Sequence, residues 1–64
     1  MKVLHFTLTN VLNVQDKTSW YILYHHETGE KQTVTTLSAV RYIVNIECEE
    51  YDAIPLIQLH NHIL

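Results

Sequence analysis

The spacing of the apolar residues changes twice along this chain, and these changes constrain the fold more than any other feature of the sequence. Near the N-terminus polar and apolar side chains alternate, as on a strand with one buried face. The apolar side chains of this first predicted strand, residues 2–9, are Leu4, Phe6 and Leu8. From Thr36, a suitable N-cap, the apolar residues instead recur every three or four positions up to Tyr51. The sequence therefore predicts one helix of about four turns among strands.

A β-hairpin is predicted around Gly29, the only glycine in the chain. The preceding residues, 20–25, are aromatic and aliphatic and favour a strand, and Gly29 suits the positive φ of a hairpin turn. The sequence permits two registers: a two-residue loop pairs Leu23 with Val34, and a three-residue loop with a bulge pairs Ile22 with Val34.

After the helix the alternating pattern of a strand returns. Pro55 favours an extended backbone at the residue before it, and the strand that follows ends near Leu64. The side chains expected to face the core are Ile57, Leu59 and Ile63. We therefore predict one α+β domain, residues 1–64, with the order strand, strand, strand, helix, strand. The helix packs on one face of an antiparallel β-meander, and the last strand lies beside the first.

The chain lacks the reinforcements that stabilise many small proteins. A domain of 64 residues buries only about 60% of the surface that its unfolded chain exposes. Cys48 is the only cysteine, which excludes an intramolecular disulfide, and no Cys/His spacing resembles a structural zinc site. Association with another chain is the remaining way to add buried surface.

The charge balance argues against nucleic acid and membranes as direct ligands. Four Lys and Arg residues against seven Asp and Glu residues give a formal net charge of −3, which disfavours binding to phosphate backbones and anionic lipids. The N-terminal residues alternate and lack the apolar segment of a signal peptide, and no apolar run approaches the ~18 residues of a membrane span. We expect a cytoplasmic protein whose partners are proteins.

The C-terminal sequence LHNHIL contains His-Asn-His but does not predict a nuclease. In His-Asn-His nucleases the three side chains converge on one phosphate from different elements, whereas on a strand His60 and His62 face one side and Asn61 the other. A solvated strand face is the simplest interpretation. Two parallel imidazoles are also an incomplete metal site. The candidates for a third ligand are His5, His25 and His26.

No combination of residues predicts catalysis. Cys48 falls on the buried stripe of the helix, and its neighbours Glu47 and Glu49 raise the pKa of a thiol instead of activating it. The chain has no Ser/His/Asp set, glycine-rich phosphate loop or paired-carboxylate pattern. We expect a protein that is not an enzyme, with no catalytic residue, no cofactor and no bound metal.

The sequence holds more apolar side chains than a helix on one sheet face can bury. A second helical stripe lies roughly opposite the first and consists of Ala39, Tyr42, Ile43 and Ile46. A helix that covers a single sheet leaves Tyr42 and Ile46 in water. Residues 20–24 are likewise apolar on both faces of their strand. We predict that Trp20, Tyr42 and Ile46 are apolar anchors for a partner.

An acidic cluster ends the predicted helix. Glu47, Glu49 and Glu50 lie in its last turn, where the helix dipole favours cations and each exposed negative charge costs about 0.3–1 kcal/mol. A solvated helix end is one explanation. The functional alternative, which we include in the predicted partner-binding site, is that the three carboxylates steer a partner with a basic surface.

The element order and the short length resemble very small phage-encoded proteins that inhibit a host enzyme. The features that carry the resemblance are the turn at Thr28-Gly29, the helix start near Thr36 and the closing strand PLIQLHNHIL. Phage uracil-DNA glycosylase inhibitors and a phage inhibitor of host RNA polymerase are of this kind. The resemblance covers residues 20–64, and the strand at residues 2–9 departs from it. It implies a viral protein that binds a host enzyme, including one that handles nucleic acid, in the host cytoplasm.

The leading hypothesis is thus a non-catalytic binding protein that inhibits or modulates a host protein by protein–protein contact. Two alternatives stay open. One is a structural homodimer or larger homo-oligomer, in which Tyr42 and Ile46 or the open sheet face pair across a two-fold axis. The other is a small metal-binding protein that uses His60 and His62.

Overall fold

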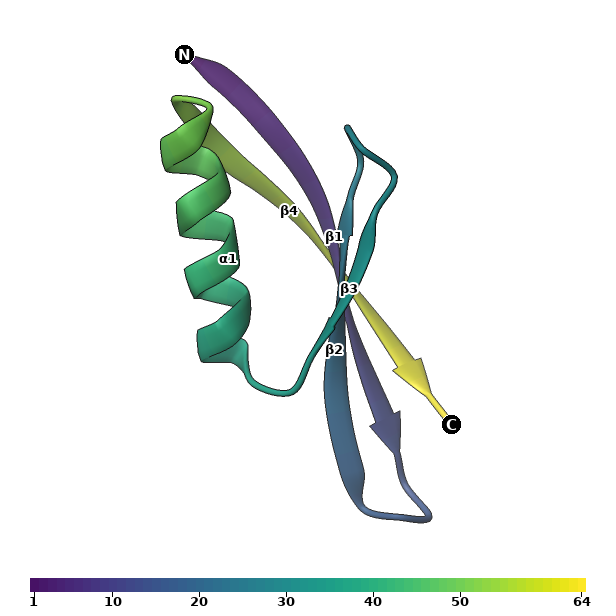
Figure 1. Cartoon of the computed structure of the whole chain (residues 1–64). Helices are drawn as coiled ribbons and strands as arrows, with labels where there is room; N and C mark the ends of the chain where they lie inside the picture. Colours follow the sequence, from purple (N-terminus) through teal and green to yellow (C-terminus); the bar gives the residue numbers. More distant parts are fainter.

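The computed structural model describes all residues, 1–64, as a four-stranded sheet with one helix on one face (Figure 1). In chain order the elements are β1 (Lys2–Asn13), β2 (Thr18–His25), β3 (Lys31–Val34), α1 (Leu37–Glu50) and β4 (Ala53–Ile63). The strands lie in the order β3-β2-β1-β4. The predicted α+β class, the antiparallel meander of β1, β2 and β3, and the place of β4 beside β1 are confirmed.

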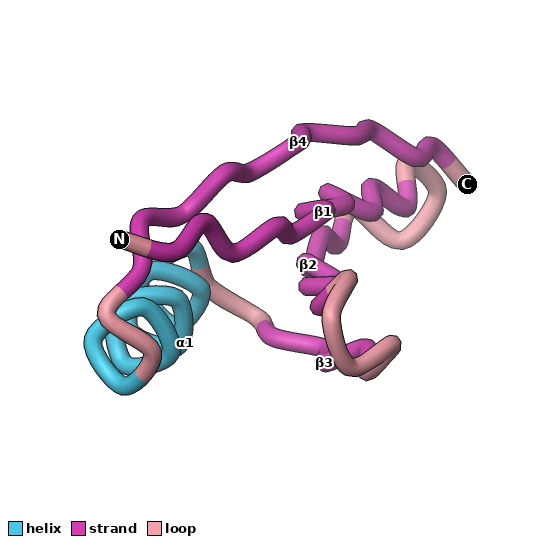
Figure 2. Tube along the Cα trace, turned by 90° about the horizontal axis from the view of Figure 1, so that it is seen from above, coloured by secondary structure: helices cyan, strands magenta, loops and turns pink.

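β4 runs parallel to β1, which makes the sheet mixed. β1 and β3 also run in one direction, because each is antiparallel to β2. α1 therefore carries the chain from one edge of the sheet to the other, as the crossover that a parallel strand requires. Figure 2 shows β3 and β4 at opposite margins of the molecule, with β1 and β2 between them.

The β2–β3 hairpin has a register that neither sequence alternative described. Val34 lies opposite Tyr21, so the predicted pairs of Val34 with Leu23 and with Ile22 are both wrong. The ladder stops earlier on β2 than expected, and the loop is correspondingly longer.

Contacts between the loop and β1 explain this register. Gly29 has the predicted positive φ, 76°, but it closes a loop of residues 26–29. The backbone N–H of His26 donates to the carbonyl oxygen of His5 at 3.1 Å, and its Nε2 lies 2.6 Å from Thr7 Oγ1. Because His26 is held by β1, it does not extend the ladder with β3.

The buried core lies beneath α1 and occupies only part of the sheet. The 14 residues of α1 span about 21 Å, whereas the 12 residues of β1 extend about 40 Å. The molecule is 43 Å long and 18 and 16 Å across. The core cluster consists of Leu4, Phe6, Leu8, Leu23, Val34, Val40, Val44 and Cys48. The predicted core face of β1 is thus confirmed, as is the N-cap, because Thr36 Oγ1 accepts the N–H of Ala39 at 3.2 Å.

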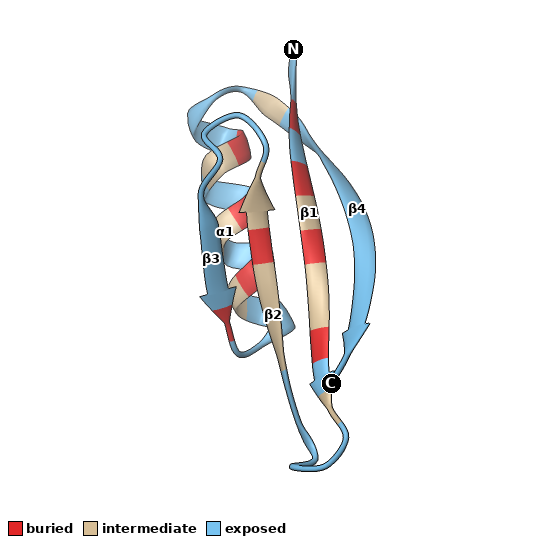
Figure 3. Ribbon diagram, turned by 90° about the vertical axis from the view of Figure 1, so that its right-hand side faces the viewer, coloured by how far each residue is buried: buried red, intermediate tan, exposed pale blue.

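Ile57, Leu59 and Ile63 face the side of the sheet that carries the core, as predicted, but they are not buried. Their register with β1 places them on the sheet face that carries the core residues, yet all three are exposed, Leu59 by 75%. The buried stripe of α1 packs on β1, β2 and β3. β4 forms the edge of the sheet and meets the helix along one flank only. Figure 3 shows it exposed along almost its whole length.

Candidate protein-binding surfaces

The outer side of α1 presents two large apolar side chains to solvent. Val40 and Val44 are buried against the sheet, while Tyr42 is 69% and Ile46 44% exposed on the opposite side of the helix. Glu49 and Glu50 are exposed beside them, and the last turn of α1 has no basic residue. We call Tyr42, Ile46, Glu49 and Glu50 the outer helix surface. The expected exposure of Tyr42 and Ile46 is therefore confirmed.

The remaining members of the second predicted stripe lie differently. Ala39 and Ile43 are half-buried and pack against the core cluster. The apolar outer side of the helix is therefore narrower than the sequence indicated.

Two predicted partner-binding residues lie away from this surface. Trp20 is half-buried on the sheet face that α1 does not cover, opposite Val11 in the β1–β2 ladder. Glu47 is half-buried at the flank of α1 that faces the β2–β3 turn. The structure thus brings Tyr42, Ile46 and the exposed carboxylates together, but it places Trp20 on the opposite side of the molecule.

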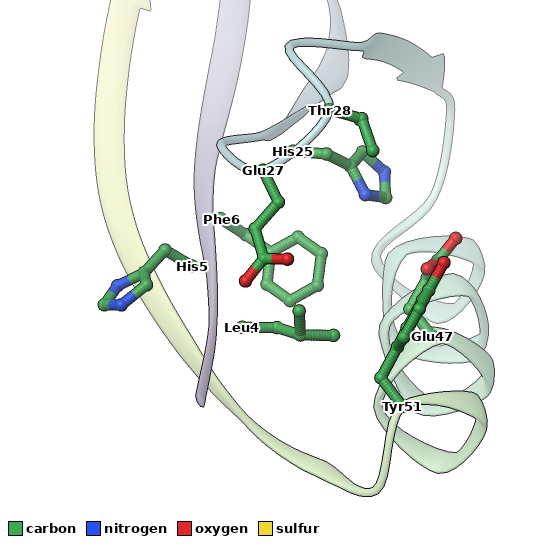
Figure 4. Close-up of a pocket in the computed structure, with 8 residues that line it drawn as sticks. All are labelled: Leu4, His5, Phe6, His25, Glu27, Thr28, Glu47 and Tyr51. Atoms are coloured by element: carbon green, nitrogen blue, oxygen red, sulfur yellow. The ribbon is translucent and has the colours of Figure 1, made fainter. Parts of the chain in front are cut away.

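Glu47 borders a small hollow between the start of β1, the β2–β3 turn and the end of α1 (Figure 4). Its volume is about 70 Å³, whereas small-molecule sites usually measure about 300–1,000 Å³. Lys2 Nζ lies 3.0 Å from Glu27 Oε2 and 5.1 Å from the centre of the Tyr51 ring. Lys2 therefore already pairs with an acidic residue at the rim of this hollow.

The histidines do not converge. His60 and His62 face the same side of β4, as predicted, because they pair with Thr9 and Val11. His5 lies on that side too, but it pairs with Leu56, four residues from His60 along the strand. No three side chains of His, Cys, Asp or Glu come together in a metal-binding group. The pair of imidazoles is thus without a third ligand from this chain.

Cys48 lies in the core, as predicted. Burial raises the pKa of its thiol above the ordinary value of 9.0, and the negative charge of Glu47 raises it further. Both effects disfavour the thiolate, which is the reactive form.

The raised pKa of Cys48 predicts a loss of stability at alkaline pH. Well below pH 9.0 the thiol is protonated in both the folded and the unfolded chain, so its contribution to the free energy of unfolding is constant. As the pH rises through 9.0, the Cys48 thiol ionises first in the unfolded chain. The free energy of unfolding then falls by at most about 1.4 kcal/mol per pH unit. We expect urea unfolding up to pH about 11 to show a steeper decline in the wild type than in Cys48→Ala. Parallel declines would refute a role for this thiol.

Sequence reasoning missed the exposure of β4. Pro55, Ile57 and Leu59 form one wall of an open groove of about 370 Å³, whose other wall is α1 with Leu37 and Arg41. On the opposite face of β4 lie further exposed side chains, Ile54 and Leu56. The available signal was the composition of residues 53–64, which are largely apolar on both faces and include no charged residue.

α1 is neither long enough nor apolar enough to cross a bilayer. Comparison of the chain with protein-family models, curated proteins and solved structures finds no match to any of them.

Proposed function

We propose that this chain is a non-catalytic protein-binding domain that modulates another protein by covering part of its surface through the outer helix surface. The observation that carries the proposal is the exposure of Tyr42, 69%, beside the exposed Ile46 on a helix whose other side is buried. Tyrosine is enriched at interface hot spots because it combines a large apolar ring with a polar end. Burial of these two side chains against a partner would supply affinity.

The charges beside these anchors define the chemistry of the partner. Glu49 and Glu50 are exposed at the negative end of the helix dipole, so the outer helix surface favours a basic surface. An enzyme that handles nucleic acid has such a surface where it binds phosphates. Inhibition of a host enzyme of this type, as the resemblance to small phage inhibitors implies, fits this chemistry.

Quantitative capture of proteins from a host extract by the immobilised chain tests the proposal. We expect a basic protein to bind the wild type, and Tyr42→Ala to weaken that binding by about 10- to 30-fold because a hot-spot side chain is lost. Glu49→Lys combined with Glu50→Lys should slow association and reduce its dependence on salt.

Thr33→Lys is the matched control, since Thr33 is exposed on β3, away from α1. It should bind like the wild type. A partner that binds Tyr42→Ala and the wild type equally well would contradict the proposed contact surface.

A further inference from the structure

The two edges of the sheet differ in how they are protected from pairing with another chain. β3 has only four residues and carries Lys31, and short, charged edges resist such pairing. β4 has 11 residues, none charged, and is exposed along almost its full length (Figure 3). A long, apolar edge of this kind is a template for another strand.

The hydrogen bonds at the two ends of β4 show which of its backbone groups are free. The carbonyl oxygen of Asp52 accepts the N–H of Lys2 at 3.2 Å, and the N–H of Leu64 donates to the carbonyl oxygen of Leu12 at 2.8 Å. Even-numbered residues therefore point their backbone groups at β1, and odd-numbered residues point them outward. Pro55, which has no N–H, is odd-numbered and sits where the edge tolerates proline. Beyond Pro55, the residues with free outward N–H and C=O groups are Ile57, Leu59, Asn61 and Ile63.

The molecule also exposes more surface than a protein of its mass normally does. Its accessible surface is 4788 Å², whereas a folded protein of 7.5 kDa typically exposes about 4,250 Å². Its radius of gyration is 12.5 Å, against about 10.7 Å for a compact chain of this length. The excess of about 500 Å² approaches the ~800 Å² that each partner buries in a standard stable interface.

We propose that β4 pairs antiparallel with β4 of a second copy, across a two-fold axis that passes through the sheet at His60. This register sets Ile57 opposite Ile63 of the second copy and Leu59 opposite its Asn61, so each free backbone group listed above finds a partner and Pro55 is not required to donate. β4 has no Asp, Glu, Lys or Arg, so no carboxylate, ammonium or guanidinium group meets its own copy across the contact. The product is one continuous sheet that contains the four strands of each copy.

The side chains support the same arrangement. A two-fold axis perpendicular to the sheet keeps both helices on one face. The groove between α1 and β4 then borders the paired strands, and Ile57, Leu59 and Ile63 of both copies gather between the two helices. Part of the surface that these three side chains expose in the monomer is thereby covered. The contact uses β4 and leaves Tyr42 on the outer side of α1, so it is independent of the proposed function.

Light scattering or sedimentation across a wide dilution range tests the pairing. We expect a monomer–dimer equilibrium whose Kd rises by about 30-fold or more in Asn61→Pro, which removes one outward donor from each copy and leaves the β1 ladder intact. Leu59→Lys should also yield monomers, because it adds a charge to the interface. Thr33→Lys on β3 and Tyr42→Ala on α1 should dimerise like the wild type. A wild type that stays monomeric at all concentrations, or variants in β4 that dimerise normally, would overturn the proposal.

Cross-linking tests the register separately. In a Cys48→Ala background, His60→Cys should form an intermolecular disulfide readily with oxidised glutathione, because the two Cα atoms would lie within the ~4.4–6.8 Å that a disulfide spans. His62→Cys should not, since its two copies would be separated by about 13 Å along the strands. Equal cross-linking of both variants would overturn the register centred on His60.

Discussion

Leu23→Ala is expected to remove a large part of the free energy of unfolding. Leu23 is 0% exposed at the centre of the core, and removal of a fully buried leucine side chain costs about 3–5 kcal/mol, including the cavity left behind. A domain of this length has a total stability of about 3–10 kcal/mol. Circular dichroism with urea titration, at a fixed protein concentration, should show a large fall in the denaturation midpoint relative to the wild type.

Leu12→Ala is the matched control. It removes the same atoms from a leucine that is 39% exposed and lies beyond the core cluster, so it should cost only about 1 kcal/mol. If the two variants lost equal stability, the core would not be confined to the half of the sheet beneath α1.

Val11→Asp is expected to have the second largest effect. Val11 is 4% exposed on the sheet face that α1 does not cover, between Trp20 on β2 and His62 on β4. A carboxylate placed there loses most of its hydration, and a bond to the neighbouring imidazole of His62 would offset only part of that cost, so the substitution costs about 3 kcal/mol or more. Thermal unfolding should show a fall in the melting temperature of tens of degrees or a loss of the transition.

Val3→Asp is the control that separates the effect of burial from the effect of placing an aspartate on this face of β1. Val3 lies on the same strand and the same face as Val11 but is 38% exposed, so its carboxylate keeps much of its water and the variant should stay folded. Comparable destabilisation by both substitutions would show that Val11 is not specially shielded. In that case strand propensity, and not burial, would explain the losses.

The elements of the fold could be predicted because they depend on local spacing. Leu4, Phe6 and Leu8 alternate on β1, and the helical stripe begins at the cap Thr36. These signals are contained in a few consecutive residues, so the sequence alone is enough to place α1 and the core face of β1. The exposure of Tyr42 follows from the same helical geometry.

The features that escaped prediction depend on contacts between distant segments. The register of the hairpin depends on the hydrogen bonds from His26 to β1. The exposure of Leu59 depends on which strands α1 packs against. Alternation gives the two faces of β4 but does not say which of them is covered. Trp20 was grouped with Tyr42 because both are large and apolar, although their strand and helix face opposite directions.

The crossover by α1 also determines when the sheet can be completed during synthesis. β1 is made first, yet its neighbour β4 ends at Ile63, so one side of β1 has no hydrogen-bonding partner until nearly all of these residues have been translated. Pairings between segments so far apart in the chain form slowly, because a long loop must close before they yield any stabilisation. In a chain that has made only β1, β2 and β3, the edge of the sheet is therefore β1, whose free backbone groups are a template for pairing with another chain.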